Sequence, residues 1–379
     1  IIGGTGAGMG NVVSDSRYGQ ILLDDGASGS VVQGNYLGTD VTGTFSVSNV
    51  NAGAGSYGVK MFDGATGSLI GGDSEAARNI IAGNRANGVH LESAATQNNV
   101  VQGNWIGLNV AGDPLGNSSR GVYINNGASN NLIGGTTEGT RNVISTSGTG
   151  NGRDGILVEG ANTGNAFLGN VITGSGGLGI DLNDDGVSSN DALDVDTGPN
   201  DLQNYPVLDL AYSAGGNTYV EGSLHSAALT DYRIEFFRGV TADSSGHGEG
   251  DVYLGAISVT TDALGDAAIL TSFTGVALNE GDYVTATATV DLGGGSYGST
   301  SEFSGNAHYD QNHAPWFVGE EEIANGQFDD GTASWDYTGG GQSVNDAFSL
   351  STIDFGGEES SEQYLHQLID TVPGKTYLL

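Results

Sequence analysis

The sequence has no cysteine and little positive charge. Its 379 residues include 10 lysines and arginines against 45 aspartates and glutamates, which gives a formal net charge of −35 at pH 7. The lack of cysteine excludes disulfides and thiolate metal sites. The negative charge excludes nucleic acid and anionic membrane surfaces as partners, because both repel an acidic protein.

Helix signals and long apolar runs are also scarce. The chain has 67 glycines, and residues 1–200 hold no apolar stripe at helical spacing. No apolar run reaches the length of about 18 residues that a membrane-spanning helix needs, so no membrane insertion is predicted. The sequence starts inside a repeat and stops inside an apolar strand, without a starting methionine or signal peptide, so we expect a piece of a longer protein.

What the sequence does contain is a short repeat. Small β-branched strands recur every 21 residues, beginning at Gly58, Asn79, Val100, Gly121 and Asn142. A fixed short period predicts a solenoid, whose units bury their apolar faces only by stacking. A βαβ motif needs about 30 residues, whereas this unit has 21 residues and no helix. We therefore predict a parallel β-helix.

A longer sequence repeat contains several copies of the short one. Residues 31–38 return almost unchanged at 100–107 and more weakly at 166–172. These separations of 69 and 66 residues indicate three 21-residue coils per super-repeat, with the extra residues placed in loops. We expect about eight coils, a rod of ~40 Å at about 4.8 Å per coil. Hydrogen-bonded amide ladders are expected from the asparagines at the turns, namely Asn35, Asn79, Asn104, Asn142 and Asn170.

Three short motifs suggest a family. Asn-Val-Ile-Ser at 142–145, Gly-Ile-Leu-Val at 155–158 and Leu-Ile-Gly-Gly at 132–135 resemble the right-handed parallel β-helix repeats of large secreted bacterial surface proteins and adhesins. That repeat family also includes periplasmic copper-site accessory proteins, pectate lyases and alginate epimerases. The resemblance covers residues 1 to about 200 and implies the fold and an extracellular or cell-surface location, but it leaves the activity open, since the family mixes enzymes with structural rods.

The sequence pattern changes after residue 203. Five longer alternating strands separated by turn clusters lie between residues 204 and 310, which predicts an antiparallel β-sandwich. This segment resembles an immunoglobulin-like module. Residues 311–379 resemble the first half of a jelly-roll carbohydrate-binding module. The predicted fold is therefore all-β: a right-handed parallel β-helix over 1–203 with an acidic loop at its C-terminal end, a β-sandwich over 204–310, and a partial jelly-roll over 311–379.

The acidic loop is the strongest candidate site. Residues 181–186 place oxygen ligands at alternate positions before a glycine, as in the opening of an EF-hand. The match ends there, because position 12 of such a loop is Ala192 here. A solvated acidic linker is the alternative to a calcium site. We also expect this loop to cap the last strand edge of the coil. The predicted calcium ligands are Asp181, Asn183, Asp185, Asp191, Asp194 and Asp196; a weaker second cluster is Asp243, Glu249 and Asp251.

No catalytic residue is predicted. His90 is expected to point outward into solvent, and Gly246-His247-Gly248 resembles a polygalacturonase motif but falls in the sandwich. The sequence favours a structural or adhesive role, with a filament or surface-layer component as its specific form, calcium as stiffener, and self-association or surface glycans as partners. One alternative is a polysaccharide-active β-helix enzyme (lyase, hydrolase or epimerase), which a groove lined by aromatics and paired acids would favour. Another is a non-catalytic carbohydrate-binding protein that uses Trp316, Trp335 and Tyr337.

Overall fold

The computed structural model describes residues 1–47, 55–146, 153–240, 242 and 244–310, together with two short strands further along. The chain divides into the units Ile1–Gln311 and Asn312–Leu379. In the second unit, β27 (Ser343–Val344) pairs antiparallel with β28 (Ala347–Phe348). The predicted jelly-roll, with Trp316, Trp335 and Tyr337, otherwise lies outside the described residues.

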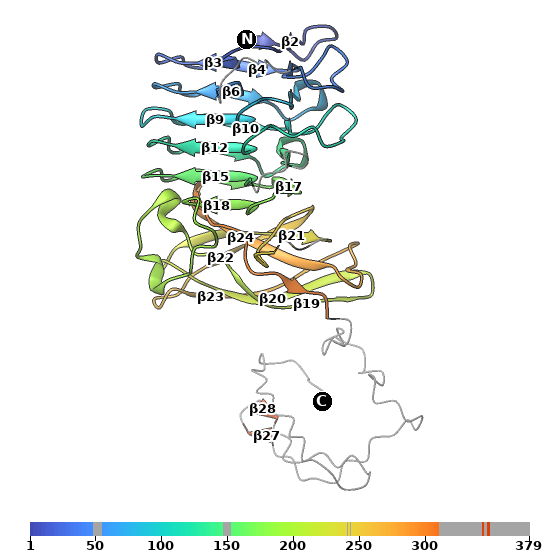
Figure 1. Cartoon of the computed structure of the whole chain (residues 1–379). Helices are drawn as coiled ribbons and strands as arrows, with labels where there is room; N and C mark the ends of the chain where they lie inside the picture. Colours follow the sequence, from blue (N-terminus) through green and yellow to red (C-terminus); the bar gives the residue numbers. More distant parts are fainter. Residues whose placement is uncertain are drawn as a thin grey trace. The chain divides into compact units, whose positions relative to one another are not determined.

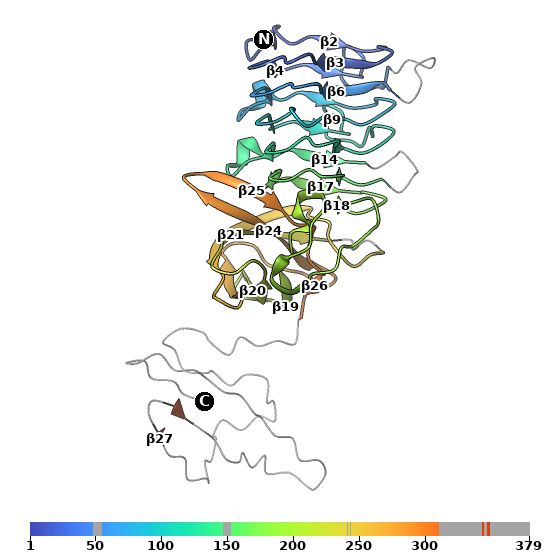
Figure 2. The same cartoon turned by 90° about the vertical axis from the view of Figure 1, so that its left-hand side faces the viewer.

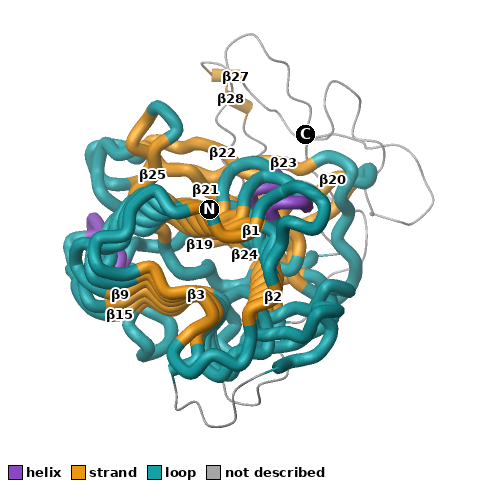
Figure 3. Tube along the Cα trace, turned by 90° about the horizontal axis from the view of Figure 1, so that it is seen from above, coloured by secondary structure: helices purple, strands orange, loops and turns teal. Residues whose placement is uncertain are grey.

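The first half of the chain is a parallel β-helix, as predicted. Eighteen short strands form three parallel sheets of six strands each, seen stacked in Figure 1 and end-on in Figure 3. The first sheet holds β1 (Ile2–Gly3), β4 (Val31–Gln33), β7 (Leu69–Gly71), β10 (Val100–Gln102), β13 (Leu132–Gly134) and β16 (Ala166–Leu168). The second holds β2 (Val12–Val13), β5 (Tyr36–Leu37), β8 (Ile80–Ile81), β11 (Trp105–Ile106), β14 (Val143–Ser145) and β17 (Val171–Thr173). The third holds β3 (Gly19–Leu23), β6 (Tyr57–Met61), β9 (Val89–Glu92), β12 (Val122–Asn125), β15 (Ile156–Glu159) and β18 (Ile180–Leu182). Short 3-10 turns lie between strands, at η1 (Glu75–Ala77), η2 (Glu138–Thr140), η3 (Ala192–Asp194) and η4 (Pro199–Leu202).

The predicted length and number of coils were wrong. One coil uses a strand from each of the three sheets, so eighteen strands make six coils. The pairing of Val32 with Ile70, and of Ile70 with Val101, gives coils of 38 and 31 residues. The 21-residue period instead joins every second strand, from β6 to β8, β10, β12 and β14, and the 69-residue repeat is two coils. Six coils span about 29 Å at about 4.8 Å each.

The coil is held by an apolar centre and by asparagine ladders. Inward side chains stack on their equivalents in the next coil; Val32, Ile70, Val101 and Ile133 are all 0% exposed. The predicted ladder is confirmed, because each side-chain amide donates to the Oδ1 of the next asparagine at 2.9–3.1 Å. It runs through Asn11, Asn35, Asn79, Asn104, Asn142 and Asn170. The side-chain amides also donate to buried backbone carbonyl oxygens, as Asn104 does to Ile70 O at 2.9 Å. Without these bonds the carbonyl oxygens would be buried without a hydrogen-bond partner.

Glycines in front of the third sheet allow the coils to approach closely. A Cβ on Gly121 would lie 2.3 Å from Ile144 Cγ2, and one on Gly155 would lie 2.4 Å from Ile172 Cγ2. At Gly179, in the last coil, the ring of Phe303 takes the place of the isoleucine, 2.7 Å from such a Cβ. Because Phe303 comes from the segment beyond the coil, the chain after residue 203 presents to the last coil a surface like that of a further coil.

The segment after the coil is built from two antiparallel sheets. One contains β19 (Val207–Ala214), β20 (Asn217–His225) and β23 (Asp266–Phe273). The other contains β22 (Val252–Thr260), β21 (Asp231–Gly239), β24 (Tyr283–Gly293) and β25 (Ser296–Thr300), with β26 (Ala307–His308) paired to β24. All five predicted strands are present. A separate apolar core that includes Tyr232, Ile234, Phe236 and Val284 lies between these sheets.

These antiparallel sheets close the end of the coil (Figure 2). The edge N–H groups of Gly169 and Leu182 donate to the side chains of Glu235 and Glu302 at 2.5 and 2.9 Å. Phe303 packs in the apolar core of the coil, as does Phe237. The acidic loop was expected to cap the last strand edge, and it shares this end with the sandwich. The N–H of Asn165 donates to Asn200 Oδ1 at 2.9 Å, and Asn200 Nδ2 donates to the carbonyl oxygen of Asn165 at 2.8 Å.

Candidate metal-binding sites

Three of the predicted calcium ligands converge. Asp191, Asp194 and Asp196 each offer a carboxylate oxygen, and these oxygens all lie within 4.8 Å of one another. The local backbone produces this convergence, because Leu193 and Asp194 adopt positive φ values of 62° and 55°. Calcium binds oxygens at about 2.3–2.6 Å, so oxygens within 4.8 Å of each other fit around one ion.

The hydrogen bonds of this cluster leave ligand capacity. Asp194 accepts from the Asn204 N–H at 3.0 Å and the Ser226 hydroxyl at 2.6 Å, and Asp191 accepts from the Val195 N–H at 3.2 Å. Asp196 Oδ1 is buried without a hydrogen-bond partner. In the described part of the chain no salt bridge reaches these three side chains.

The electrostatics of the cluster also suit a cation. Burial, with the charges of Asp196 and Asp191 adding to it, raises the pKa of Asp194 to about 6. Burial and the charge of Asp191 also raise the pKa of Asp196. A raised carboxylate pKa means that the negative charge is poorly compensated, and a bound cation would compensate it.

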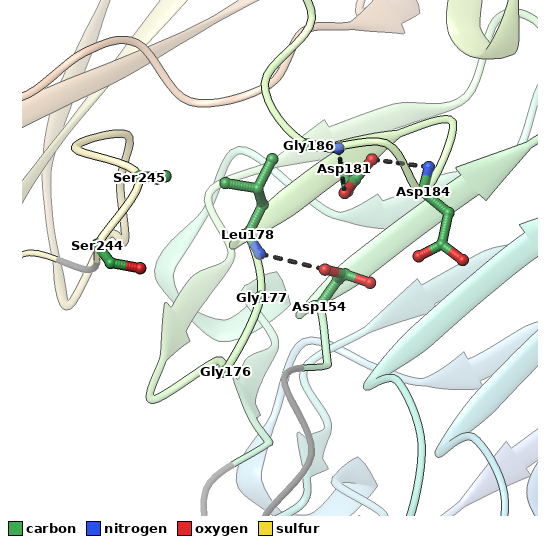
Figure 4. A pocket seen from close by; sticks show the side chains of 9 residues that line it. All are labelled: Asp154, Gly176, Gly177, Leu178, Asp181, Asp184, Gly186, Ser244 and Ser245. Atoms are coloured by element: carbon green, nitrogen blue, oxygen red, sulfur yellow. Dashed lines mark hydrogen bonds between the residues drawn. The ribbon is translucent and has the colours of Figure 1, made fainter.

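A second cluster brings Asp181 together with a residue that sequence reasoning missed. Asp154, Asp181 and Asp184 each place a carboxylate oxygen within 4.8 Å of the other two. They border a cavity of about 270 Å³, whose far wall includes Ser244 and Ser245 (Figure 4). The carboxylates of Asp154 and Asp181 are held by the N–H groups of Leu178, Asp184 and Gly186 at 3.1, 2.8 and 3.4 Å.

This second cluster already has a positive neighbour. Arg120 lies 2.8 Å from Asp184 and 3.6 Å from Asp154. Asp154 and Asp181 are only 5% and 4% exposed, and burial, with the charge of Asp154, raises the pKa of Asp181 to about 6. Burial also raises the pKa of Asp154. Because Arg120 neutralises part of the charge, this cluster suits a divalent cation less well than Asp191, Asp194 and Asp196 do.

The other predicted ligands lie outside both clusters. Asn183 donates to Asp185 at 2.9 Å on the surface. In the weaker predicted cluster, Asp243 lies outside the described residues. Glu249 is buried and accepts from the Ser175 N–H at 2.6 Å, and Asp251 accepts from the Val240 N–H at 3.0 Å.

The outward face of the third sheet carries a packed polar and aromatic row. The prediction that His90 is solvated was wrong, since His90 is 4% exposed and stacks on Tyr123 with a centroid distance of 4.8 Å. Its Nε2 lies 3.1 Å from Asn125 Oδ1. Burial lowers the pKa of His90 to about 4, and the nearby Lys60 acts in the same direction. Long neighbours from adjacent coils therefore cover a side chain that points away from the core.

The motif around His247 is structural. His247 Nδ1 lies 3.0 Å from the carbonyl oxygen of Phe303, and the N–H of Gly248 donates to Asn306 at 3.0 Å. These bonds hold the loop against the residues that close the coil. The motif thus lies in the sandwich, as expected, and away from the outward faces of the coils.

Comparisons with known proteins give little further information. No family model matches the chain, and no curated protein matches it. Among solved structures, it is similar to CsgH of R. palustris, at 13% identity and a TM-score of 0.16, over 26% of this chain and 91% of that one. It is also similar to the full-length tailspike protein 2 of Escherichia coli O157:H7 bacteriophage CAB120, at 11% identity and a TM-score of 0.15, over 78% of this chain and 59% of that one. The enzymatically active domain of a bacteriophage CBA120 tailspike protein 2 matches at 11% identity and a TM-score of 0.14, over 78% of this chain and 66% of that one.

The chain thus spans about 59% of the full-length tailspike. Similarities of this size do not bear on activity, and the fold stands on the strand pairing itself. Within the described residues no helix is long and apolar enough to cross a membrane.

Proposed function

We propose that the chain is a rigid structural segment of an extracellular bacterial surface protein, with calcium bound by Asp191, Asp194 and Asp196. The observation that supports it most is the shared core, since Phe237 and Phe303 of the sandwich belong to the apolar cluster of the coil. Two modules joined by a common core resist bending better than modules joined by a linker. A surface protein would use such a piece as a spacer that presents protein or glycan contacts.

Calcium would stiffen the region beside this junction. Asp194 binds Ser226 and Asn204, so an ion on Asp194 ties the loop to the start of the antiparallel sheets. A ligand that binds only the folded state raises stability by about 2.7 kcal/mol at a hundredfold excess over its Kd.

Thermal unfolding with and without a chelator tests the calcium site. Calcium is expected to raise the Tm of the unmodified protein and of Asp185→Asn, an exposed predicted ligand outside the cluster, but not the Tm of Asp194→Asn. An equal rise in Asp194→Asn, or no rise in any protein, would remove calcium from the proposal.

A second candidate is a polysaccharide-active enzyme, favoured by the cavity beside Asp154, Asp181 and Asp184. A general acid needs a raised pKa, and that of Asp181 is about 6. Retaining glycosidases separate their two carboxyl groups by roughly 5 Å, and carboxylate oxygens of these three residues lie within 4.8 Å of one another. A screen of acidic polysaccharides, with and without calcium, distinguishes the two functions. Product release that Asp181→Asn abolishes would establish the enzyme, and no product from any substrate would leave the structural role.

A further inference from the structure

One strand of the antiparallel sheets has a long unpaired edge. In the described part of the chain, β22 pairs with β21 on one side and with no strand on the other. Its nine residues are all half-buried or exposed, whereas β21 and β24 are mostly buried. A bulge opposite Phe236 and Phe237 bends the start of β22, and residues 255–260 continue in regular register. The strand has no aspartate, glutamate, lysine, arginine or proline, which are residues that commonly protect a strand edge from pairing.

The hydrogen-bond register shows which backbone groups of β22 are free. The N–H of Thr261, directly after the strand, donates to the carbonyl oxygen of Thr230 at 3.0 Å. Because successive residues of an antiparallel strand turn their N–H and C=O groups to opposite sides, Val259 and Ile257 also face β21. The residues between them turn these groups to the outer edge. They are Ala256, Ser258 and Thr260.

The other neighbour of β21 supports this assignment. Ala288 of β24 accepts from the N–H of Ser301 and donates to its hydroxyl oxygen, both at 2.9 Å, so its backbone groups face away from β21. Ile234 of β21 lies opposite both Ala288 and Ile257. Since Ile234 does not bond Ala288, its N–H and C=O groups face Ile257. The alternation along β22 is therefore fixed from both sides of β21.

The two ends of this edge differ in charge. Asp231 and Asp262 lie at the C-terminal end of β22 and are exposed. Within the described residues neither forms a salt bridge. At the other end, next to Asp251, positive charge is supplied by Arg238, opposite the first residue of β22, and by Arg141. A strand added to this edge is therefore favoured by positive charge beside Asp231 and Asp262.

The edge of β23 is also unpaired, but that of β22 is better held in place. Tyr253 of β22 and Phe237 of β21 pack in the apolar core of the coil. The three-stranded sheet that contains β23 contributes no described residue to that core. The sheet of β22 is thus fixed against the coil before a partner arrives, and a preorganised edge loses less conformational freedom on binding.

We propose that the outer edge of β22 binds an extended segment of a partner protein, which adds as an antiparallel strand with basic residues at its N-terminal end. In this orientation the basic residues lie beside Asp231 and Asp262. Main-chain hydrogen bonds to the free groups provide the affinity. A second copy fits less well, because its own β22 brings no positive charge and the net charge of −35 makes copies repel. The proposal rests on the structural role proposed above, for which it names one protein contact.

A peptide titrated with the full chain tests this edge. The fluorescein-labelled probe is as long as β22, with lysines at its N-terminal end followed by alternating threonine and valine. Saturable binding is expected. The same peptide with methyl groups on its amide nitrogens cannot donate to the edge and is expected to bind roughly tenfold more weakly or worse. Glutamates in place of the lysines are expected to weaken binding roughly threefold or more, by an amount that high salt reduces.

Hydrogen exchange at individual amides locates the added strand. On binding, exchange is expected to slow at Ala256, Ser258 and Thr260. It is expected to stay unchanged at Ile257 and Val259, which already bond β21. Slower exchange in β23 with no change in β22 would place the peptide on the other sheet and overturn the proposal.

Two matched proline variants distinguish the edges. Ser258→Pro removes a free donor and no bond to β21, so it is expected to weaken binding roughly tenfold while the folded circular dichroism spectrum is retained. Ser272→Pro makes the same change on β23 and is expected to leave binding unchanged. Ser272 lies opposite Tyr219, whose backbone groups face β19, so its N–H is not bonded within the sheet.

A charge variant keeps the test decisive if Ser258→Pro fails to fold. Asp262→Asn retains an oxygen acceptor for the N–H groups of its own turn and leaves the edge unchanged. It is expected to reduce the difference in affinity between the lysine and glutamate peptides, and an unchanged difference would contradict the proposed orientation.

Further results would overturn the proposal. These are absence of saturable binding up to about 1 mM peptide, full affinity of the methylated peptide, and equal weakening by Ser272→Pro. A concentration-dependent dimer that Ser258→Pro abolishes would assign the edge to a second copy instead. None of these results alters the chelator and polysaccharide experiments, which decide the structural role separately.

Discussion

Glu302 gives the most specific prediction, because its carboxylate is buried where the coil meets the sandwich. It is 2% exposed and accepts from the N–H groups of Leu182 and Ser188, both at 2.9 Å. No salt bridge to it is present in the described part of the chain. Burial raises its pKa from 4.5 to about 7, and the nearby charge of Asp181 acts in the same direction.

The sign and size of the effect follow from linkage. A carboxyl group whose pKa is raised on folding favours the folded state below its unfolded pKa and loses that contribution as the pH rises through the folded value. A rise from 4.5 to about 7 corresponds to about 3 kcal/mol, lost between about pH 4.5 and pH 8. Glu302→Gln has the shape of the protonated acid at every pH. Its amide nitrogen cannot accept the N–H bond that one carboxylate oxygen accepts from Leu182 or Ser188, so the variant should be less stable than the parent near pH 5 by about 1–3 kcal/mol. Between pH 5 and pH 8 the variant should lose about 2–3 kcal/mol less stability than the parent protein.

Urea unfolding at pH 5 and pH 8 measures this difference. Glu280→Gln, at an exposed position, removes the same charge from the surface and serves as the control. The expected result is a flatter pH dependence for Glu302→Gln alone. If Glu302→Gln and Glu280→Gln lose equal stability between pH 5 and pH 8, the burial argument is refuted.

Three further predictions concern the coil and its junction. Asn104→Ala leaves the buried carbonyl oxygen of Ile70 without its amide donor and should lower the free energy of unfolding by roughly 2–5 kcal/mol in urea titrations; a loss below about 0.5 kcal/mol would contradict the ladder. Phe303→Ala should cost about 3–5 kcal/mol and speed hydrogen exchange in β16 and β18 far more than in β4; uniform acceleration would contradict its place at the coil end. Arg141→Ala removes a guanidinium that lies 3.9 Å from the ring centroid of Tyr253 and should cost about 1–2 kcal/mol in the same titrations; a neutral result would show that this contact is incidental.

The all-β fold could be predicted because its signals are local. Alternation of apolar and polar residues identified long strands such as Asp266–Phe273, which buries mainly one face. The strands β19, β25 and β26 were not predicted. β26 has only two residues, which is too short for an alternating pattern to appear.

The coil length could not be predicted, because the period of a sequence repeat does not reveal how many strands make up one coil. Strands that resemble one another in sequence, such as those opening at Asn79 and Val100, lie in different sheets. Similar burial demands produce similar sequences on all three sides of the coil. Only the hydrogen-bond register, such as Ile70 beside Val101, shows which strands are neighbours.

Only part of the candidate site could be predicted, because one cluster is local in sequence and the other depends on which coils are neighbours. Asp191, Asp194 and Asp196 are close in sequence, so a loop could be expected to bring them together. Asp154 lies 27 residues before Asp181, and its approach depends on the coil register, in which Gly155 N–H binds the carbonyl oxygen of Leu178. With the correct coil length, that neighbour could have been found from the sequence.

The glycines in front of the third sheet, such as Gly121 and Gly155, have a consequence for how β-helices of this kind change length. From the second coil on, a glycine at the start of the third-sheet strand leaves room for an isoleucine of the next coil, as at Gly58, Gly88, Gly121 and Gly155. In the last coil, Gly179 leaves the same room for Phe303. The terminating module therefore fits whichever coil happens to be last. Whole turns can be gained or lost by recombination between repeats without redesign of the terminator, whereas a change of a single strand would rotate this glycine away from Phe303 and leave the end open.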